Sequence, residues 1–336
     1  MFPAVSDLRG RYPDAEIHWL VEPAFAELAA WHSAIHKVVT IPLRAYKKTW
    51  WKIPSLLGRL RKQLRAEQYD IVLDAQGLIK SALLARLAGC TVCGFAAGSA
   101  RESPASWFYQ KSANVAGGMH IIEKNRMLVA MIFGADVSSA ADFGLERSSK
   151  QLMQTGFSGG LKEITDSPYI VLLHGTTWNS KFWPEAYWAE LIHMLAQQGW
   201  RCLLPWGDEA ERLRAMRLQE AGAGHARVLP KTTLTELAGV LLHARAFVSV
   251  ETGIGHLAAV LDVPGVMLHG PTDPGYSGIL GKACRHIGSG IYCSPCFKRD
   301  CPRIQTAAET PPCQLQIRPQ QIYQQCLELM ATAAEG

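Results

Sequence analysis

The sequence predicts an α/β protein built from two doubly wound domains. Apolar segments at residues 69–73, 169–174 and 247–250 each end in a polar turn with glycine and then lead into a helical pattern. That succession is typical of parallel sheets covered by helices. The chain has 336 residues, whereas single hydrophobic cores stop growing at about 250 to 300 residues. Between residues 138 and 167 the pattern dissolves into Ser, Gly and short polar runs, so we place the domain boundary there.

The composition is that of a globular protein, with 48% apolar residues. A formal net charge of +5 favours an anionic partner or a membrane surface, and nothing points to nucleic acid. Apolar runs are shorter than about 18 residues and the start lacks a basic leader with an apolar core, so we expect no membrane span and no signal peptide. Nine cysteines argue against a secreted disulfide framework and indicate a cytoplasmic protein.

In the first half, residues 3–12 have a helical pattern, and strands are expected at 16–21 and 69–73. The segment RAYKKTWWK at 44–52 mixes four cations with three aromatic residues. It is either a solvated loop or a clamp for an anionic, partly apolar substrate at a membrane surface. Composition leaves both readings open. For His120, a structural hydrogen-bonding role is favoured over a catalytic one, because the pattern gives it no partner.

The second half begins with a strand that stops at Gly175 and is followed by Thr176, Thr177 and Lys181. Hydroxyl groups and a lysine after a strand suit a diphosphate, because the cation offsets the charge that grows as a phosphate leaves. A capped helix with a surface lysine is the alternative. A helix is expected from Pro184, with further strands and helices alternating behind it.

Residues 247–275 contain a strand, a polar turn, a short helix, a second strand and another polar turn. The first turn, with Glu251, Thr252 and Gly253, lies at a helix N-terminus, where free N–H groups and the helix dipole attract anions. We expect Gly253 and Gly255 to allow close backbone approach. An ordinary strand-to-helix turn capped by Thr252 is the alternative. In open α/β sheets, ligands bind at the carboxyl ends of the strands.

The C-terminal part holds a cysteine group and then an amphipathic helix from residue 319. Two readings are open for the cysteines, a structural zinc site and reduced thiols in a packed loop. The spacing is looser than that of a zinc ribbon, so packed thiols are favoured and no metal is expected. The cysteines concerned are Cys293, Cys296, Cys301 and Cys313.

Several longer motifs, taken together, resemble family 9 glycosyltransferases over nearly the whole chain. The donor half of that family is matched by HGTTWNSKFWPEAYW at 174–188, LPWGDEAERLRAMRL at 204–218, LPKTTL at 229–234, VSVETGIGHLAA at 248–259 and GPTDPG at 270–275. The acceptor half of its lipopolysaccharide heptosyltransferase I branch is matched by DAQGLIKSALLARLAG at 74–89 and ARESPASWFYQ at 100–110. Each motif alone is weak, but their joint order is specific.

The resemblance implies a GT-B architecture, with two Rossmann-like domains facing a cleft, and it assigns roles to particular residues. We expect an N-terminal acceptor domain at 1–150, a C-terminal donor domain at 165–318 and a final helix at 319–336. Glu251 stands where the family usually has Asp, which moves the charge by one methylene. The implied donor-binding residues are Thr176, Thr177, Lys181, Glu211, Thr232, Glu251, Thr252, Gly253 and His256, with Lys181 also offsetting the leaving diphosphate. The acceptor-binding residues that we expect are Arg44, Lys47, Lys48, Gln76, Lys80 and Arg101.

The resemblance also implies the reaction, which is inverting transfer of heptose from ADP-heptose to the Kdo-lipid A inner core of lipopolysaccharide. No cofactor or essential metal is implied, and we expect a monomer, peripheral at the cytoplasmic face of the inner membrane. Heptosyltransferase II, another nucleotide-sugar glycosyltransferase of the family, and a non-catalytic nucleotide-sugar binding protein are the alternatives.

Members of the family begin with a strand that ends in a Gly-Asp pair, and the Asp is the general base. Phe2 to Val5 of this chain align with residues just after that pair, so the first strand and the base are missing from the sequence as given. Asp74 and Glu102 are the acids most apt to face the acceptor, yet the resemblance places neither within reach of its proton. We therefore expect this chain to bind the donor without transferring the sugar efficiently. We also expect the natural protein to be translated from a start codon upstream of the one given.

Overall fold

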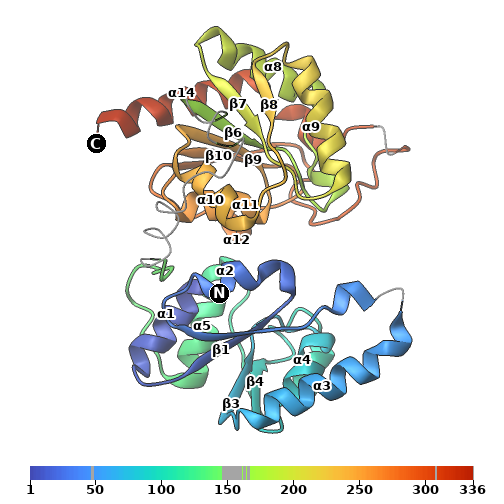
Figure 1. Cartoon of the computed structure of the whole chain (residues 1–336), viewed down its shortest axis with the longest axis vertical. Helices are drawn as coiled ribbons and strands as arrows, with labels where there is room; N and C mark the ends of the chain where they lie inside the picture. Colours follow the sequence, from blue (N-terminus) through green and yellow to red (C-terminus); the bar gives the residue numbers. More distant parts are fainter. Residues whose placement is uncertain (47–48, 146–160, 162–163, 165–166, 307–308, 336) are drawn as a thin grey trace. The chain divides into compact units, whose positions relative to one another are not determined.

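The computed structural model describes residues 1–46, 49–145, 161, 164, 167–306 and 309–335. The chain divides into two compact units, Met1–Ser148 and Ser149–Gly336, and both are α/β (Figure 1). No helix of the described segments is long and apolar enough to cross a membrane.

Unit 2 contains one parallel sheet of six strands in the order β11-β10-β9-β6-β7-β8. Its first strand, β6, is central, so the chain winds outward first to one side and then to the other, which is the doubly wound arrangement that the sequence predicts. The strands are β6 (Tyr169–Leu173), β7 (Arg201–Leu204), β8 (Ala226–Val228), β9 (Ala246–Val250), β10 (Gly265–His269) and β11 (Cys284–Gly288).

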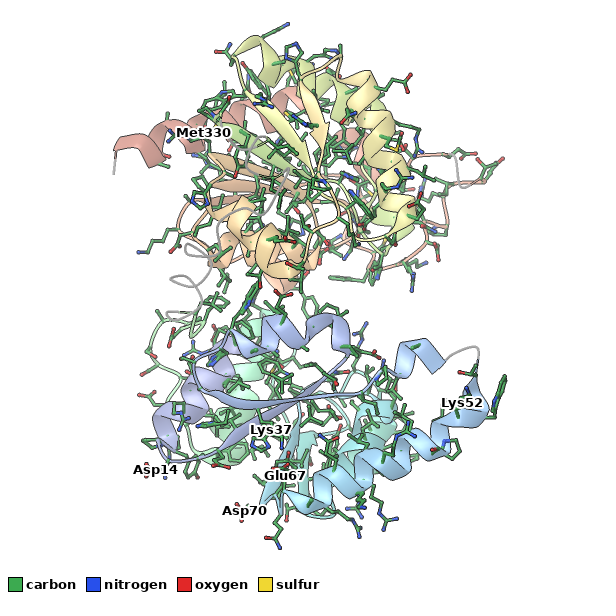
Figure 2. The ribbon with its side chains drawn as sticks, in the orientation of Figure 1. Asp14, Lys37, Lys52, Glu67, Asp70 and Met330 are labelled. Atoms are coloured by element: carbon green, nitrogen blue, oxygen red, sulfur yellow. The ribbon has the colours of Figure 1, made fainter. Side chains whose placement is uncertain are left out.

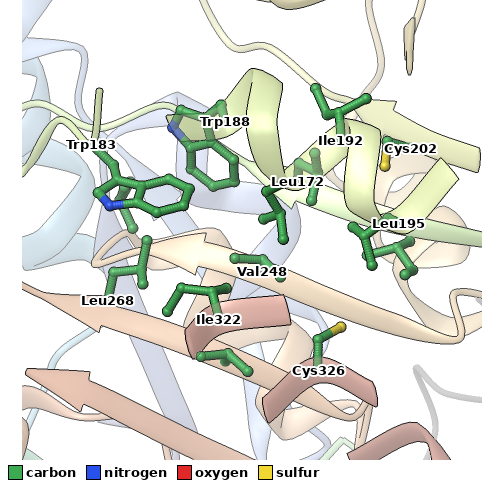
Figure 3. Close-up of a cluster of buried hydrophobic side chains, with 14 of the residues drawn as sticks. Leu172, Trp183, Trp188, Ile192, Leu195, Cys202, Val248, Leu268, Ile322 and Cys326 are labelled. Atoms are coloured by element: carbon green, nitrogen blue, oxygen red, sulfur yellow. The ribbon is translucent and has the colours of Figure 1, made fainter. Parts of the chain in front are cut away.

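Every residue of β6, β9 and β10 is buried, because helices cover both faces of a parallel sheet. A core cluster joins one face of these strands to α8, α9 and α14 around Trp183 and Trp188 (Figure 3). Ile322 and Cys326 of α14 belong to this cluster, so the final helix is an integral part of unit 2. The helices are η5 (Asn179–Lys181), α8 (Glu185–Gln197), α9 (Glu209–Ala221), α10 (Leu234–Leu242), α11 (Gly253–Val260), α12 (Pro274–Ser277), α13 (Pro312–Gln316) and α14 (Pro319–Glu335).

Unit 1 contains two parallel sheets, one with β1 and β2 and one in the order β3-β4-β5. Its strands are β1 (Ile17–Val21), β2 (Ile35–Thr40), β3 (Ile71–Asp74), β4 (Thr91–Phe95) and β5 (Lys111–Ala113). Its helices are α1 (Phe2–Arg11), η1 (Pro23–Phe25), α2 (Ala26–Ala30), η2 (Leu43–Tyr46), η3 (Trp50–Lys52), α3 (Ile53–Ala66), α4 (Ile79–Arg86), η4 (Ser103–Phe108) and α5 (Ile121–Phe133).

The two sheets of unit 1 share one covering helix. Leucines of α3 pack with Leu20 of β1, Val39 of β2 and Val72 of β3 in a single cluster. Within the described residues, β1 pairs only with β2, and β3 pairs only with β4.

Candidate functional site

Four loops gather at the carboxyl edge of the unit 2 sheet. They follow β6, β7, β9 and β10, which are mutually parallel neighbours. Because the carboxyl ends of parallel strands meet at one edge, the sequence motifs after these strands are brought together there. Five of the expected donor residues lie in the loops after β6 and β9, and contacts described below join those two loops.

Lys181 and Glu251 form an ion pair at the centre of this edge. The Lys181 Nζ atom lies 3.0 Å from Glu251 Oε2, and the two side chains are only 12% and 10% exposed. The lysine also lies 4.3 Å from the ring centroid of Trp178. Thr176 joins the same two loops, because its hydroxyl donates to the Glu251 carbonyl oxygen at 3.4 Å. The loops after β6 and β9 therefore place a cation and hydroxyl groups together, as the motifs predict.

Two further hydroxyl groups hold the Glu251 carboxylate. Ser277 donates to Oε1 at 2.8 Å, and Thr272 donates to Oε2. Burial opposes the charged form of Glu251, but the Thr272 hydrogen bond and the Lys181 charge outweigh it and lower the pKa of the carboxyl. Glu251 is therefore ionised around neutral pH and keeps two hydrogen-bond donors besides the lysine.

A histidine pair lies behind Thr272. His269 Nδ1 is 3.3 Å from Thr272 Oγ1, and its Nε2 is 3.2 Å from His286 Nδ1. His286 Nε2 in turn is 3.1 Å from the carbonyl oxygen of Ile279, which can only accept a hydrogen bond. Burial lowers the pKa of His269 to about 4, so this ring is neutral at physiological pH and connects the carboxylate to the core of the sheet.

The contacts from Ile279 through His286, His269 and Thr272 to Glu251 cannot all be hydrogen bonds at once. Four contacts run from the Ile279 carbonyl to the Glu251 carboxylate, and both ends accept. Two neutral imidazoles and one hydroxyl supply only three protons. While both rings are neutral, one of the four contacts is therefore not a hydrogen bond. The Thr272 hydroxyl, whose contact with Glu251 is the shortest of the four, donates to the carboxylate.

Glu211 occupies the edge between β6 and β7. Its carboxylate accepts the Gly207 N–H at 2.6 Å, and its own N–H donates to Asp208 at the start of α9 at 2.9 Å. A side chain at Gly175 would overlap the Glu211 carboxylate, so glycine is required for this close approach. The structure thus places Glu211, one of the expected donor-binding residues, next to the loop after β6.

The two glycines that follow β9, Gly253 and Gly255, have different surroundings. Thr252 is the N-cap of α11 but makes no side-chain capping hydrogen bond, so the simple capped-turn alternative is wrong. A Cβ on Gly253 would meet nothing within 4 Å, whereas a Cβ on Gly255 would lie 2.6 Å from Ser249 Oγ and 2.5 Å from Met267 Cε. The expectation that Gly255 admits a ligand is therefore wrong, because this glycine allows α11 to pack on the sheet.

Three other expected donor residues lie in segments near the same edge. Thr177 is exposed, and Thr232 is half-buried in the segment between β8 and α10. His256 is half-buried in the first turn of α11. The motifs did not single out Thr272, Ser277 or His269 for this site, although the turn at 270–275 signalled a loop at the correct edge.

In unit 1, the structure brings three expected acceptor residues to the carboxyl end of β3. A Cβ on Gly77, next to Gln76, would lie 3.0 Å from the Arg101 backbone N, and Lys80 is in the first turn of α4. All three are exposed. Of the basic aromatic segment, Lys47 and Lys48 and the side chain of Arg44 lie outside the described residues.

The two acids considered at this end of unit 1 are engaged structurally. Asp74 is 5% exposed and accepts hydrogen bonds from Ser81 and Tyr109, both at 2.7 Å, and from the Gln76 N–H at 2.9 Å. Glu102 accepts the Ile79 N–H at 2.8 Å at the start of α4. Both carboxylates therefore hold the start of α4 and the turn after β3. His120 caps α5 by accepting the Ile122 N–H at 3.3 Å, which is the structural role favoured above.

The four C-terminal cysteines lie between β11 and α13 and in α13 itself. In the described part of the chain, no group of three or more His, Cys, Asp or Glu side chains is placed to hold a metal ion, and the expectation of packed thiols without a metal stays a prediction. All four are free thiols. Burial, with a smaller effect of Cys301, raises the pKa of Cys313 to about 11, which is the behaviour of an inert packed thiol.

Comparisons with known proteins agree with this geometry. The sequence model of glycosyltransferase family 9 (heptosyltransferase) matches residues 57–306. Lipopolysaccharide heptosyltransferase 1 of Pseudomonas aeruginosa is 42% identical, over 99% of this chain and 94% of that protein. The structure of E. coli heptosyltransferase WaaC with ADP superimposes with a TM-score of 0.79 at 34% identity, over 98% of this chain and 94% of that one.

A second WaaC structure, with ADP-2-deoxy-2-fluoro heptose, superimposes with a TM-score of 0.73 at 37% identity and covers 86% of this chain and 88% of that one. The family model spans most of the chain, including the Lys181 and Glu251 loops. The chain is therefore a glycosyltransferase and belongs to family 9, the heptosyltransferase family.

Proposed function

We propose that the protein transfers heptose from ADP-heptose to the Kdo-lipid A inner core in lipopolysaccharide core biosynthesis. The observation that carries this proposal is the Lys181–Glu251 pair at the carboxyl edge of unit 2, in a chain whose close relatives are lipopolysaccharide heptosyltransferases of type 1. The WaaC structures with ADP and with a fluorinated ADP-heptose support the same donor.

When the donor binds, Lys181 would move from Glu251 to the diphosphate. Loss of the cation ordinarily leaves the buried carboxylate without a partner, at a cost of several kcal/mol. Here Thr272 and Ser277 still donate to that carboxylate, which reduces the cost. Lys181 then offsets the negative charge that develops on the leaving ADP, with Thr176 and Thr177 as additional donors, and this role needs no metal ion.

The remaining donor contacts follow the four loops. Glu211 would bind the ribose and Thr232 would lie near the adenine, while Thr252, Gly253 and His256 surround the diphosphate and the heptose. Thr252 supports this role because its hydroxyl is not used as a helix cap. Glu251 is available to the sugar hydroxyls once the lysine has moved to the diphosphate.

For the acceptor, we assign Gln76, Lys80 and Arg101 at the carboxyl end of β3, together with Arg44, Lys47 and Lys48. The exposed cations suit the carboxylates and phosphates of an anionic inner core. We do not assign Asp74 or Glu102 as the general base, since their carboxylates already hold the local structure through hydrogen bonds. We further propose that the enzyme acts as a monomer at the cytoplasmic face of the inner membrane.

Calorimetric titration with ADP-heptose followed by a transfer assay with Kdo-lipid A tests the function. We expect saturable donor binding, and heptosylated acceptor that accumulates only slowly, because no general base is identified among the residues of this chain. A chain that fails to bind ADP-heptose contradicts the proposal. Binding without product from any acceptor, even at high enzyme concentration, would favour the nucleotide-sugar binding protein instead.

A further inference from the structure

Helices α3 and α4 of unit 1 present an unusual charge pattern to solvent. They contain four and two cations and no Asp or Glu. All six of these cationic residues are exposed, and in the described part of the chain none of them forms an ion pair. We call them the basic surface: Arg59, Arg61, Lys62 and Arg65 of α3 with Lys80 and Arg86 of α4.

The fold places the two helices on one side of unit 1. Leu56, Leu60 and Leu64 of α3 belong to the same buried cluster as Leu84 and Ala88, in and just after α4, and the helices lie side by side (Figure 1). At 100° per residue, the three leucines occupy one narrow arc of α3 and its cations the opposite arc. The cations therefore face outward together.

The arginines of another basic helix, α9, are by contrast paired with carboxylates. In α9 of unit 2, Arg212 pairs with Glu209, and Arg214 and Arg217 pair with Glu185. Beyond the end of α3, Glu67 pairs with Lys37 (Figure 2), and Glu102 is engaged at the start of α4. Among the described residues, no carboxylate pairs with the six cations of the basic surface. Their positive potential is therefore available to attract an external anion.

Exposed apolar side chains accompany the cations. Ile79 and Leu83, the latter 48% exposed, share the outer face of α4 with Lys80 and Arg86. Trp51, 60% exposed, lies in η3 immediately before α3. Trp107, 80% exposed, lies in η4. Tryptophan and aliphatic side chains among lysine and arginine are typical of surfaces that rest in the interface of a lipid bilayer.

We infer that α3, α4 and η4 form the membrane-docking surface of the protein, and that its partner is an anionic phospholipid bilayer. The six unpaired cations match the negative lipid headgroups, while Ile79, Leu83 and the two tryptophans enter the headgroup region. The biological reason for such docking rests on the proposed function, because an enzyme that modifies a membrane-embedded lipid benefits from being held at the bilayer surface. The docking itself depends only on the surface of unit 1.

Vesicle sedimentation tests the inference. The full chain is mixed with phosphatidylethanolamine vesicles, with and without phosphatidylglycerol. We compare R59Q/R61Q/K62Q with a matched triple variant in unit 2, R227Q/K282Q/K298Q, which also removes three exposed cations. Each cation at an anionic surface contributes about fivefold to partitioning, so the α3 triple variant should lose on the order of 100-fold. The unit 2 variant should stay within a few-fold of the parent.

Two further arms identify the contact. Rising salt should weaken binding to anionic vesicles, and L83S/W51S should reduce binding further while its thermal unfolding stays close to that of the parent. Equal binding by the α3 triple variant and the parent, or equal loss in both triple variants, overturns the inference. Binding to neutral vesicles only when they carry the Kdo-lipid A acceptor also overturns it, because the surface would then recognise the acceptor and not the bilayer.

A transfer assay with a water-soluble, acyl-free acceptor separates this inference from the proposed function. Where the parent protein turns over that acceptor, the α3 triple variant should do so at the same rate, since no membrane is involved. Absence of donor binding and turnover in the parent would contradict the proposed function and leave the vesicle result unaffected.

Discussion

Lys181 is the central side chain of the proposed donor site and contacts Glu251 and Trp178. We predict that Lys181→Ala weakens ADP-heptose binding by roughly 10- to 150-fold, since a hydrogen bond to a charged group contributes about 1.5 to 3 kcal/mol. Calorimetry measures this, with the exposed Lys282→Ala as control. Unchanged donor affinity and turnover would remove Lys181 from the site.

The same substitution leaves Glu251 buried without its cation. The double variant Lys181→Ala, Glu251→Gln should therefore regain part of the thermal stability that Lys181→Ala loses, without regaining donor affinity. A double variant that is less stable than the single one would show that Thr272 and Ser277 already satisfy the carboxylate.

His174, at the end of β6, has no solvent exposure, and burial lowers its pKa to about 4, with Arg214 adding to the shift. In the unfolded chain it takes up a proton below about pH 6.5. Between these values the unfolded state holds more protons, so the free energy of unfolding decreases as the pH falls from about 6.5 to 4. The loss amounts to about 3 kcal/mol.

Denaturant unfolding at several pH values measures this slope. His174→Asn should flatten it, whereas His225→Asn, at an exposed position, should not. A titration of His174 near pH 6.5 in the folded protein, followed by NMR, would contradict the prediction.

Site residues were predictable where the chemistry is local to a strand end. Lys181 and Glu251 follow apolar strands within a few residues, so their place at the carboxyl edge follows from the sheet alone. Ser277 and His269 depend on how α12 and β11 fold back on the site, which no local pattern encodes. Gly255 was misread because a glycine needed for packing and a glycine needed for a ligand look alike in sequence.

At the scale of elements, α11 provides a matched pair of substitutions. We predict that Gly255→Ala destabilises the protein by about 1 to 3 kcal/mol, because the new methyl group overlaps Ser249 and Met267 and overpacking has that cost. Gly253→Ala, where the space is open, should keep the melting temperature and weaken ADP-heptose binding. Thermal denaturation and calorimetry decide both, and equal melting temperatures of the two variants would contradict the packing argument.

The central elements were the predictable ones. Strands β6 and β9 are continuous apolar runs because both faces are buried, and they stand out in the sequence. Strand β2 reads IHKVVT, with only Val39 buried, and β8 has three residues. These short or partly exposed strands have few buried apolar residues. Their sequences alone therefore do not identify them, and they are recognised from their pairing in the sheet.

At the scale of the whole molecule, the donor site is contained in unit 2, since Lys181, Glu211, Glu251 and their partners all belong to it. Donor recognition and transfer are therefore separable, and the expectation of donor binding without efficient transfer stays a prediction. Unit 1 supplies the proposed acceptor residues and the basic surface. The resemblance motifs located both halves because their order along the chain follows the order of the strands.

The divided sheet of unit 1 has a consequence for local opening. Each of β1 and β3 has a described strand partner on one side only, so part of their amide groups has no ladder acceptor, while β6 and β9 are paired on both sides. We predict that deuterium enters β1 and β3 much faster than β6 and β9, as followed by mass spectrometry of peptic fragments. Equal protection would mean that another segment completes the ladder. Otherwise unit 1 opens as a separate cooperative unit, and its heat-absorption peak precedes that of unit 2 in a calorimetric scan.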